Sequence, residues 1–245
     1  MIPQKIHYCW FGGKPLPKSA LKCIASWRKF LPDYEVVEWN ERNFDFRSIP
    51  YISDAYDAGK YAFVSDYARF KILYEHGGLY FDTDVELIRP IDDIIRQGAF
   101  MGFESDFSPE NVGGINPGLG LGVEAGNPIY GELLEKYKNL KFRNPDGSLN
   151  LVTIVKYTTD LLIEYGLENN ADIQMVKGIS VYPKEYFNPF DMKEGRPRPT
   201  KNTRSIHWYS SSWESKPQKL KRKMKHLANR LLGKKTIAGL KKMFS

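Results

Sequence analysis

The feature that most constrains this chain is a short apolar run at residues 79–81, which lies between two glycines and two acids. Just before it, residues 59–75 carry aromatic side chains at helical spacing and predict a helix with one apolar stripe. The stripe consists of Phe63, Tyr67, Phe70 and Tyr74. The pair Gly77-Gly78 can end that helix, because glycine adopts the positive φ of many helix C-termini. A helix that leads at once into a buried strand is typical of an α/β sheet.

The opening of the chain supports the same fold class. Residues 5–11 and 34–39 predict strands, and between them we expect a helix capped by Ser19. Its expected apolar positions are Leu21, Ile24, Ala25 and Trp27. This strand–helix–strand order predicts a parallel pair with a right-handed crossover. Further strands are expected at 100–103, 173–176, 179–182 and 206–208, helices at 128–138 and 150–165, a glycine-rich loop near ligand at 111–122, and irregular chain at 184–203.

Composition places the chain among ordinary globular proteins. Its 245 residues suit one large domain, or one domain with an appendage, and 42% hydrophobic residues exclude the disordered class. The two cysteines, Cys9 and Cys23, are too few for a disulfide framework, and we expect free thiols in a reducing compartment. We see neither a signal-peptide pattern at the start nor the roughly 20 apolar residues of a membrane span. The expectation is therefore a cytoplasmic protein.

The charge is divided unevenly along the chain. Residues 216–245 carry eleven Lys or Arg and no acid, so of the net charge of +7 the remaining residues contribute −4. Apolar residues recur in this tail at helical spacing on either side of Gly233. They are Leu220, Met224, Leu227 and Leu231, then Ile237, Leu240 and Phe244. We predict a catalytic domain at 1–215 and a basic amphipathic helical tail at 216–245 that lies on an anionic membrane surface. Packing of the tail on the domain is the other possibility.

The acids that follow the apolar run are the candidate chemical centre. In an extended segment Asp82 and Asp84 would point the same way, because side chains of a strand alternate. Two carboxylates on one side suit a hard divalent cation, which can bridge a diphosphate and stabilise a departing nucleotide. The alternative is a pair of solvated turn acids. On the preceding helix Asp66 and Arg69 share a face, either as a surface ion pair or as a polar pair for sugar hydroxyls.

These residues together resemble a known family. The segment from Ser65 to Asp84 resembles the DXD-containing sugar-binding region of glycosyltransferase family 32, which includes capsular polysaccharide transferases and yeast outer-chain mannosyltransferases. The large clostridial glucosylating toxins are more distant relatives. Residues 6–13 and 206–213 resemble the two ends of the family domain, so the resemblance covers about residues 1–215. It implies a GT-A fold (one Rossmann-like α/β domain), a nucleotide-sugar donor, Mn²⁺ or Mg²⁺, and retention at the anomeric carbon.

The resemblance also implies roles for individual residues. By position, Trp10 matches an aromatic that stacks on the nucleotide base, Ser65 lies near the nucleotide, and Tyr80 packs beside the donor. The sugar-binding pair is Asp66 and Arg69, while Asp82 contacts ribose, sugar and metal and Asp84 ligates the metal. Near the C-terminal end, His207 is a candidate third metal ligand. Three further candidates, Ser212, Trp213 and Lys216, could close as a flap over the diphosphate. Lys216 or Arg69 would also stabilise the leaving group. Asn116 is a candidate contact to the donor sugar from the glycine-rich loop.

The expected function is thus a metal-dependent retaining glycosyltransferase that moves a hexose from a nucleotide-sugar, with UDP favoured by Trp10, to a capsular or lipid-linked glycan at the inner face of the plasma membrane. Glycoside hydrolysis would need two carboxylates across the scissile bond, and the alternation of Asp82 and Asp84 favours a metal site instead. A second alternative is a non-catalytic protein that binds nucleic acid or anionic membrane through its basic tail. No nucleic-acid recognition motif accompanies that tail, so we expect no nucleic-acid partner.

Overall fold

The computed structural model describes residues 1–105, 113–168, 170–192 and 194–210, together with residues 217, 220, 221 and 224. The predicted flap residues Ser212, Trp213 and Lys216 lie outside the described residues, as does most of the predicted tail. Within the tail, Leu220 and Met224 occupy helical positions and are exposed.

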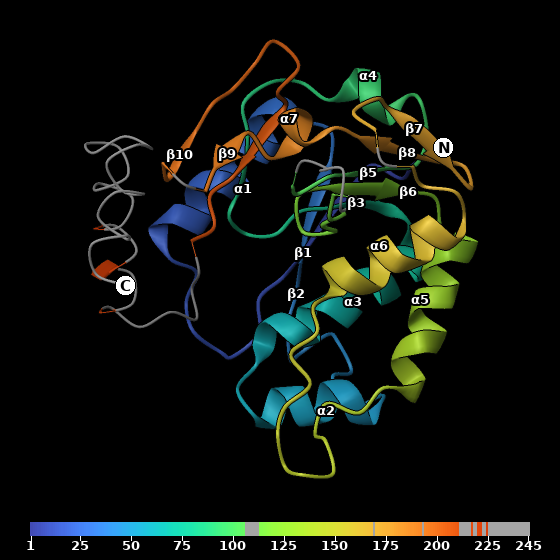
Figure 1. Cartoon of the computed structure of the whole chain (residues 1–245). Helices are drawn as coiled ribbons and strands as arrows, with labels where there is room; N and C mark the ends of the chain where they lie inside the picture. The colour runs from blue at the N-terminus through green and yellow to red at the C-terminus, as the bar shows by residue number, and fades with distance from the viewer. Residues whose placement is uncertain are drawn as a thin grey trace, which may run out of the picture.

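The described chain forms an α/β fold around a seven-stranded mixed sheet (Figure 1). Its strands are β1 (Lys5–Cys9), β2 (Glu35–Trp39), β3 (Gly78–Tyr80), β5 (Phe100–Gly102), β6 (Leu121–Val123), β7 (Gln174–Val176) and β8 (Ile179–Tyr182). The spatial order is β2-β1-β3-β6-β5-β8-β7. Strand β1 is parallel to both β2 and β3, β5 is parallel to β8, and β6 runs antiparallel to β3 and β5. The predicted α/β sheet with a parallel opening pair is confirmed.

Helix α1 (Lys18–Phe30) connects β1 to β2, as predicted, but it begins differently. Ser19 is not its cap, because the helix already starts at Lys18 and the extended Pro17 occupies the N-cap position without a side-chain hydrogen bond. The buried face consists of Ala20, Cys23, Ile24 and Trp27. Leu21, expected on that face, is 51% exposed. Ile24 and Trp27 are thus buried as expected, whereas Leu21 and Ala25 are exposed.

Helix α3 (Tyr61–His76) confirms the central helix, although one stripe proved too narrow a description. Most side chains from Val64 to Leu73 are buried, and they lie on several faces of the helix, whereas Tyr74 is 38% exposed. The reason is that α3 lies between the sheet and three other helices, α2 (Pro50–Asp57), α5 (Pro128–Asn139) and α6 (Ile154–Glu164). Gly77 ends the helix at φ 62°, and its N–H donates to the carbonyl of Leu73. The predicted glycine cap is confirmed.

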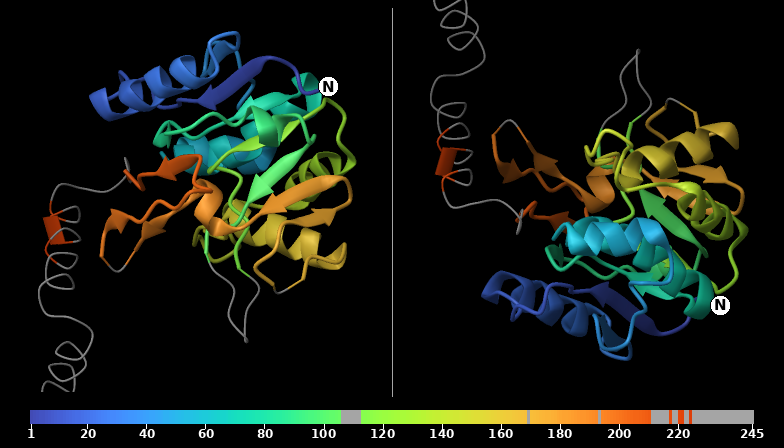
Figure 2. Two further views of the ribbon diagram at one scale, coloured as in Figure 1. Left: turned by 90° about the horizontal axis from the view of Figure 1, so that it is seen from above. Right: turned by 90° about the horizontal axis from the view of Figure 1, so that it is seen from below.

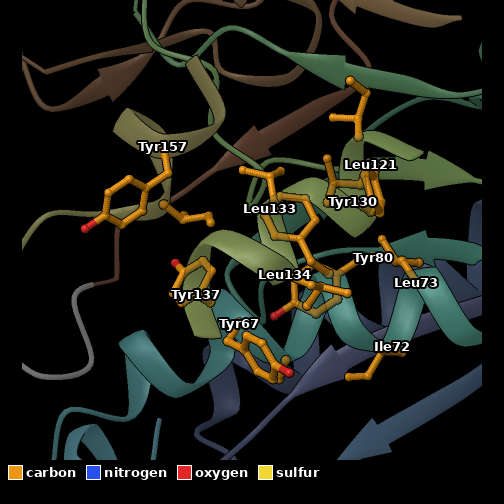
Figure 3. Close-up of a cluster of buried hydrophobic side chains, with 14 of the residues drawn as sticks. Tyr67, Ile72, Leu73, Tyr80, Leu121, Tyr130, Leu133, Leu134, Tyr137 and Tyr157 are labelled. Atoms are coloured by element: carbon orange, nitrogen blue, oxygen red, sulfur yellow. The ribbon is translucent and has the colours of Figure 1, made fainter. Parts of the chain in front are cut away.

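Among the described residues, two hydrophobic cores cover the two faces of the sheet. Alternation along the strands divides them, so that Leu79 faces the core under α1 while Tyr80 faces the core under α3 and α5. Figure 2 shows α1 and the α5–α6 pair on opposite sides of the strands. Figure 3 shows the second core, where Tyr80 lies near Leu73 of α3 and Leu134 of α5. The segment that leads into the acids is thus held from both sides.

Several elements were missed by the sequence patterns. The segment 184–203, expected to be irregular, contains α7 (Lys184–Phe187) and the antiparallel pair β9 (Phe190–Asp191) and β10 (Arg196–Pro197). The glycine-rich loop ends early, because β6 occupies 121–123, and α2 and the short α4 (Asp92–Ile95) were not foreseen. The predicted last strand is β11 (Ser205–His207), which pairs antiparallel with β4 (Val85–Leu87). That pairing brings the C-terminal part of the described chain beside the acids.

Two further expectations concern the cysteines and membrane-spanning helices. Cys9 and Cys23 are both buried free thiols, as predicted. In the ranges that the structure describes, no helix combines the length and the apolar character needed to cross a bilayer.

The side chain of His7 in β1 is buried between Gly77 and Trp39, and its protonation tests the packing there. Its Nε2 faces the carbonyl oxygen of Gly77 at 3.0 Å, and its Nδ1 accepts from the indole of Trp39 at 3.0 Å. A carbonyl only accepts and an indole only donates, so the ring is neutral with its proton on Nε2. Burial lowers the pKa of His7 to about 4, although the bond to Gly77 raises it.

We predict that His7 makes the fold acid-sensitive. Because the unfolded imidazole binds a proton near pH 6.5 and the folded one only near pH 4, stability is lost as the pH falls through this window. The difference corresponds to about 3 kcal/mol between pH 7 and pH 4. Urea unfolding of the wild type and of His7→Gln at both pH values measures it. The wild type should lose more stability than the variant, and equal losses would contradict the assignment.

Candidate active site

The segment that contains Asp82 and Asp84 lies where the order of the strands in the sheet reverses. Strand β1 has β2 on one side and β3 on the other, so the carboxyl ends of β1 and β3 form a topological switch point. Ligands of open α/β sheets bind in the crevice outside such a point. Trp10 directly follows β1, and Asp82 follows β3 with one residue between. The sheet therefore places the expected base-stacking residue and the first acid at the same edge.

The path of the chain through the acids differs from the expected extended strand. The N–H of Val85 donates to the carbonyl of Asp82 at 2.9 Å, which closes a turn over Thr83 and Asp84. The alternation argument for Asp82 and Asp84 is therefore wrong, since it assumed extended backbone. The turn gives the two carboxylates different partners: Asp82 faces Arg69 of α3, and Asp84 faces His207 of β11.

Asp82 is fixed by three elements of the fold. Its Oδ1 accepts from the Tyr80 hydroxyl at 3.1 Å and lies 3.2 Å from a guanidinium nitrogen of Arg69. Its backbone N–H donates to the carbonyl of Gly118 at 3.1 Å. Burial raises the pKa of this carboxyl, while the Arg69 charge lowers it and Asp84 raises it further. The position of Asp82 is thus set by hydrogen bonds and by a buried cation.

Arg69 is that buried cation, and only 4% of its side chain is exposed. One guanidinium nitrogen lies 3.0 Å from Asp66 and 3.2 Å from Asp82, and Nε donates to the carbonyl of Ser65 at 3.2 Å. The guanidinium carbon also stands 5.0 Å from the centre of the Tyr80 ring. This geometry excludes the surface ion-pair interpretation of Asp66 and Arg69. Arg69 instead joins the two acids from the middle of the helix.

The protonation behaviour of this cluster follows from burial. Burial raises the pKa of Asp66 to about 6, which outweighs the lowering effect of Arg69. For Arg69 burial acts in the opposite direction, but the charges of Asp82 and Asp66 hold its pKa above its ordinary value. The guanidinium therefore stays charged, and it compensates carboxylates that would otherwise be buried without a partner.

Asp84 contacts the last residue of β11 and the residues that follow it. Its Oδ1 lies 3.0 Å from His207 Nε2, and its Oδ2 accepts from both the backbone N–H and the hydroxyl of Ser210, at 2.8 and 3.0 Å. The N–H of Trp208 donates to the Asp84 carbonyl at 3.0 Å. Burial alone would raise the pKa of Asp84, but His207 and Ser210 hold it well below the usual range. The pKa of His207 is raised, because the pull of Asp84 exceeds the effect of burial.

Ser210 is a site residue that the sequence analysis missed. Ser210 begins a run of three serines. The family resemblance pointed to Ser212, beside Trp213, as the candidate for the diphosphate flap. The signal that could have identified Ser210 is its distance of three residues from His207. That spacing let the chain after β11 turn back onto the same carboxylate.

A divalent cation fits the donor set around Asp84. Asp84 Oδ1 and His207 Nε2 are 3.0 Å apart, the separation of about 3.0 Å expected for neighbouring ligands of an octahedral ion with bonds of about 2.1 Å. His207 Nδ1 is buried and finds no hydrogen-bond partner in the described structure, so Nε2 is the nitrogen that the site uses. The described residues contain no ready-made cluster of three His, Cys, Asp or Glu ligands. Substrate phosphates and water would complete such a site, as is usual for Mg²⁺.

The glycine-rich loop supplies a close backbone approach to the acids. A Cβ added to Gly118 would stand 2.0 Å from Asp82 Oδ2 and 3.0 Å from the Arg69 guanidinium. Asn116 holds this loop, since its Oδ1 accepts from the N–H of Gly118 at 2.7 Å and its own N–H donates to Gly102 at 3.2 Å. The loop therefore does lie at the site as expected. The Asn116 side chain is buried and is used within the loop.

Of the remaining predicted residues, Tyr80 contacts an acid of the site, whereas Ser65 and Trp10 bond to nearby backbone carbonyls. Tyr80 is fully buried and acts on Asp82, while Ser65 is half-buried and its hydroxyl donates to the carbonyl of Tyr61 at 3.2 Å within α3. Trp10 is half-buried, and its indole donates to the carbonyl of Lys14 at 2.5 Å. The structure thus brings Asp66, Arg69, Tyr80, Asp82 and Gly118 together on one side and Asp84, His207 and Ser210 on the other.

The central part of this site lies in a region of the chain that is similar to known proteins. Residues 17–101 match the family model described as "Glycosyltransferase sugar-binding region containing DXD motif". An uncharacterized glycosyltransferase of Acanthamoeba polyphaga mimivirus is 27% identical over 196 residues, which cover 77% of this chain and 76% of the relative. Inositol phosphoceramide mannosyltransferase 3 of Schizosaccharomyces pombe is 31% identical over 143 residues, 57% of this chain but only 37% of the yeast enzyme.

A solved structure shows the same fold. The PaToxG glycosyltransferase superposes with a TM-score of 0.50 and 19% identity, covering 66% of this chain and 69% of that one. The expected GT-A fold is confirmed by this likeness together with the mixed α/β sheet. The family match contains Asp66, Arg69, Asp82 and Asp84, whereas His207 and Ser210 lie beyond it. The region match, the relatives and the fold agree, and they indicate a glycosyltransferase whose residues 17–101 match the DXD-containing sugar-binding region.

Proposed function

We propose that this glycosyltransferase moves a hexose from a nucleotide-sugar to a glycan acceptor with the help of Mn²⁺ or Mg²⁺. The observation that carries the proposal is the pairing of Asp84 Oδ1 with His207 Nε2 at 3.0 Å, beside the switch point of the sheet. A carboxylate oxygen, which Mg²⁺ and Mn²⁺ prefer, and an imidazole nitrogen at this separation can share one divalent cation. The same edge of the sheet is where a nucleotide is expected to bind.

Asp84 and His207 would hold the cation, and Asp82 lies beside them at the end of β3. A bound cation would neutralise charge on the diphosphate as it leaves. Ser210 keeps the Asp84 carboxylate oriented by two hydrogen bonds. The low pKa of Asp84 keeps this carboxylate ionised at neutral pH, and a bound cation would displace the proton that Asp84 stabilises on His207.

The transfer itself breaks one bond and forms another at the anomeric carbon. The acceptor oxygen bonds to this carbon as the bond to the diphosphate oxygen breaks, and the acceptor proton leaves with the nucleoside diphosphate. We propose attack from the face that the diphosphate leaves, so that the configuration is retained. We assign Arg69 to positioning rather than to the leaving group, because its guanidinium is buried between Asp66 and Asp82.

The identities of donor and acceptor are finer parts of the proposal. Trp10 follows β1 at the nucleotide edge, which supports base stacking, and UDP is the nucleotide we propose. The Schizosaccharomyces pombe relative is a mannosyltransferase, so mannose belongs among the hexoses tested. For the acceptor we propose a capsular or lipid-linked glycan at the inner face of the plasma membrane. The basic tail would supply the peripheral membrane contact.

The metal assignment predicts the behaviour of Asp84→Asn. The variant keeps the shape of the side chain but loses its charge, and Mn²⁺-dependent release of nucleotide should fall by about 100-fold or more. The assay incubates the purified chain with a panel of UDP- and GDP-hexoses, in Mn²⁺ and in EDTA. Asp93→Asn, which removes an exposed acid paired with Arg204, is the control. Release that persists in EDTA, or in Asp84→Asn, would contradict the metal-dependent mechanism.

The positioning role of Arg69 predicts a large stability effect. Arg69→Met leaves the buried Asp66 and the half-buried Asp82 without their cation, and the free energy of unfolding should fall by about 3–5 kcal/mol at pH 7. Arg47→Met is the matched control, because it removes a guanidinium that binds Asp57 through two bonds of 2.8 Å at the exposed surface. Chemical denaturation measures both. If the two variants lost the same stability, the buried cation would not be central to the fold.

The tail proposal predicts binding to anionic vesicles. With eleven basic residues and no acid, residues 216–245 should carry the full chain to the lipid layer in flotation with phosphatidylglycerol vesicles but not with neutral phosphatidylcholine vesicles. A chain that ends at residue 215 should remain in solution with both. Equal flotation of the two chains on anionic vesicles would overturn the membrane assignment of the tail.

A further inference from the structure

Tyr209 has an unusual backbone conformation beside the candidate metal site. It follows His207 and Trp208 at the end of β11, and its φ is +47°, one of two positive values among the non-glycine residues that the structure describes. A bulky side chain avoids this left-handed region, because Cβ approaches the backbone too closely. Such a conformation persists only when the surrounding contacts fix it, and residues with such conformations are common at functional sites.

The contacts that fix Tyr209 are formed by its hydroxyl group. The hydroxyl donates to Glu104 Oε1 at 3.1 Å and accepts from the amide nitrogen of Asn188 at 2.6 Å. The same amide nitrogen donates to the backbone carbonyl of Glu104 at 2.7 Å. Asn188 is 1% exposed and directly follows α7, while Glu104 follows β5. Three separate parts of the chain therefore meet at one hydroxyl.

This network determines where the neighbours of Tyr209 point. The Tyr209 ring lies against the His207 ring, with 4.2 Å between the ring centres. On the other side of Tyr209 in the chain, Ser210 directs both its N–H and its hydroxyl to Asp84 Oδ2. The positive φ at Tyr209 is the bend between these two contacts. It allows His207 and Ser210 to approach the two oxygens of one carboxylate.

We propose that Tyr209, held by Glu104 and Asn188, is a positioning residue that sets the affinity of the Asp84 site for divalent cations. The inference rests on the metal-dependent function proposed above. Groups that orient metal ligands typically change affinity by about 10–100-fold when they are removed. His207 needs such support, because its Nδ1 has no hydrogen-bond partner in the described structure and its ring is oriented by Asp84 and by packing against Tyr209.

Ordinary packing would not require the hydroxyl. Tyr209 also contacts Phe190, with ring centres 5.6 Å apart, and a phenylalanine would preserve both ring contacts. If Tyr209 served only to fill space, removal of the oxygen would leave the metal site unchanged. The effect of the hydroxyl on metal affinity therefore separates a positioning role from a packing role.

The test compares Mn²⁺ dissociation constants, measured on the full chain by electron paramagnetic resonance of free Mn²⁺ in the presence of UDP. Tyr209→Phe should raise the constant about 10-fold or more. Glu104→Gln removes a charge that acts on His207 but keeps an acceptor oxygen for Tyr209, so it should bind Mn²⁺ more tightly than Glu104→Ala, which should resemble Tyr209→Phe. The double variant Tyr209→Phe with Glu104→Ala should be little weaker than either single variant, because both remove one interaction.

Tyr165→Phe is the control, because it removes a tyrosine hydroxyl that donates to Glu132 in another part of the fold. Its Mn²⁺ affinity should equal that of the wild type. A Tyr209→Phe chain with unchanged Mn²⁺ affinity would overturn the positioning role, whether or not its melting temperature fell. If Asp84→Asn also left wild-type Mn²⁺ binding unchanged, the metal site itself would be refuted. Loss in Asp84→Asn without loss in Tyr209→Phe would refute only the inference about Tyr209.

Discussion

The buried contact of Arg69 with Asp66 and Asp82 is the interaction on which the site depends. A buried carboxylate and a half-buried one cannot lie beside each other without compensation, and the guanidinium lies 3.0 Å from Asp66 and 3.2 Å from Asp82. Since Arg69 and Asp66 belong to α3 and Asp82 follows β3, the contact ties the central helix to the end of the central strand. It therefore fixes where the chain turns towards Asp84. After that turn the chain enters β4, which pairs with β11 and so brings His207 to Asp84.

The two acids of the motif consequently have different surroundings. Asp82 is set among Arg69, Tyr80 and the backbone of Gly118, with no space for a side chain at position 118. Asp84 faces His207 and Ser210 and keeps a low pKa. The first acid is thus part of the framework that joins helix, strand and loop. The second presents the carboxylate that is best prepared for a cation.

Features set by local spacing were predictable from the sequence. Asp66 and Arg69 are three residues apart on a helix, so their contact followed from helical geometry. Gly77 at the end of α3 and the parallel pair β1–β2 followed from turn chemistry and from the strand–helix–strand pattern. Whether the ion pair was buried could not be seen, because burial depends on the helices that cover α3.

Features set by distant contacts were not predictable. Ser210 meets Asp84 across 126 residues, and only the pairing of β11 with β4 brings them together. The extended path expected for Asp82 and Asp84 failed because a turn, closed by the Val85 N–H, reverses the chain between two strands of different sheets. The hydroxyl network of Tyr209 joins three elements and leaves no periodic trace in the sequence.

The most direct test of the central claim is to locate Mn²⁺ by anomalous diffraction from crystals grown with Mn²⁺ and UDP. The account predicts a single strong peak in contact with Asp84 and His207 Nε2, with the diphosphate beside it at the ends of β1 and β3. Asp82 should still be paired with Arg69. A peak at another place, or a nucleotide bound away from this edge of the sheet, would contradict the account.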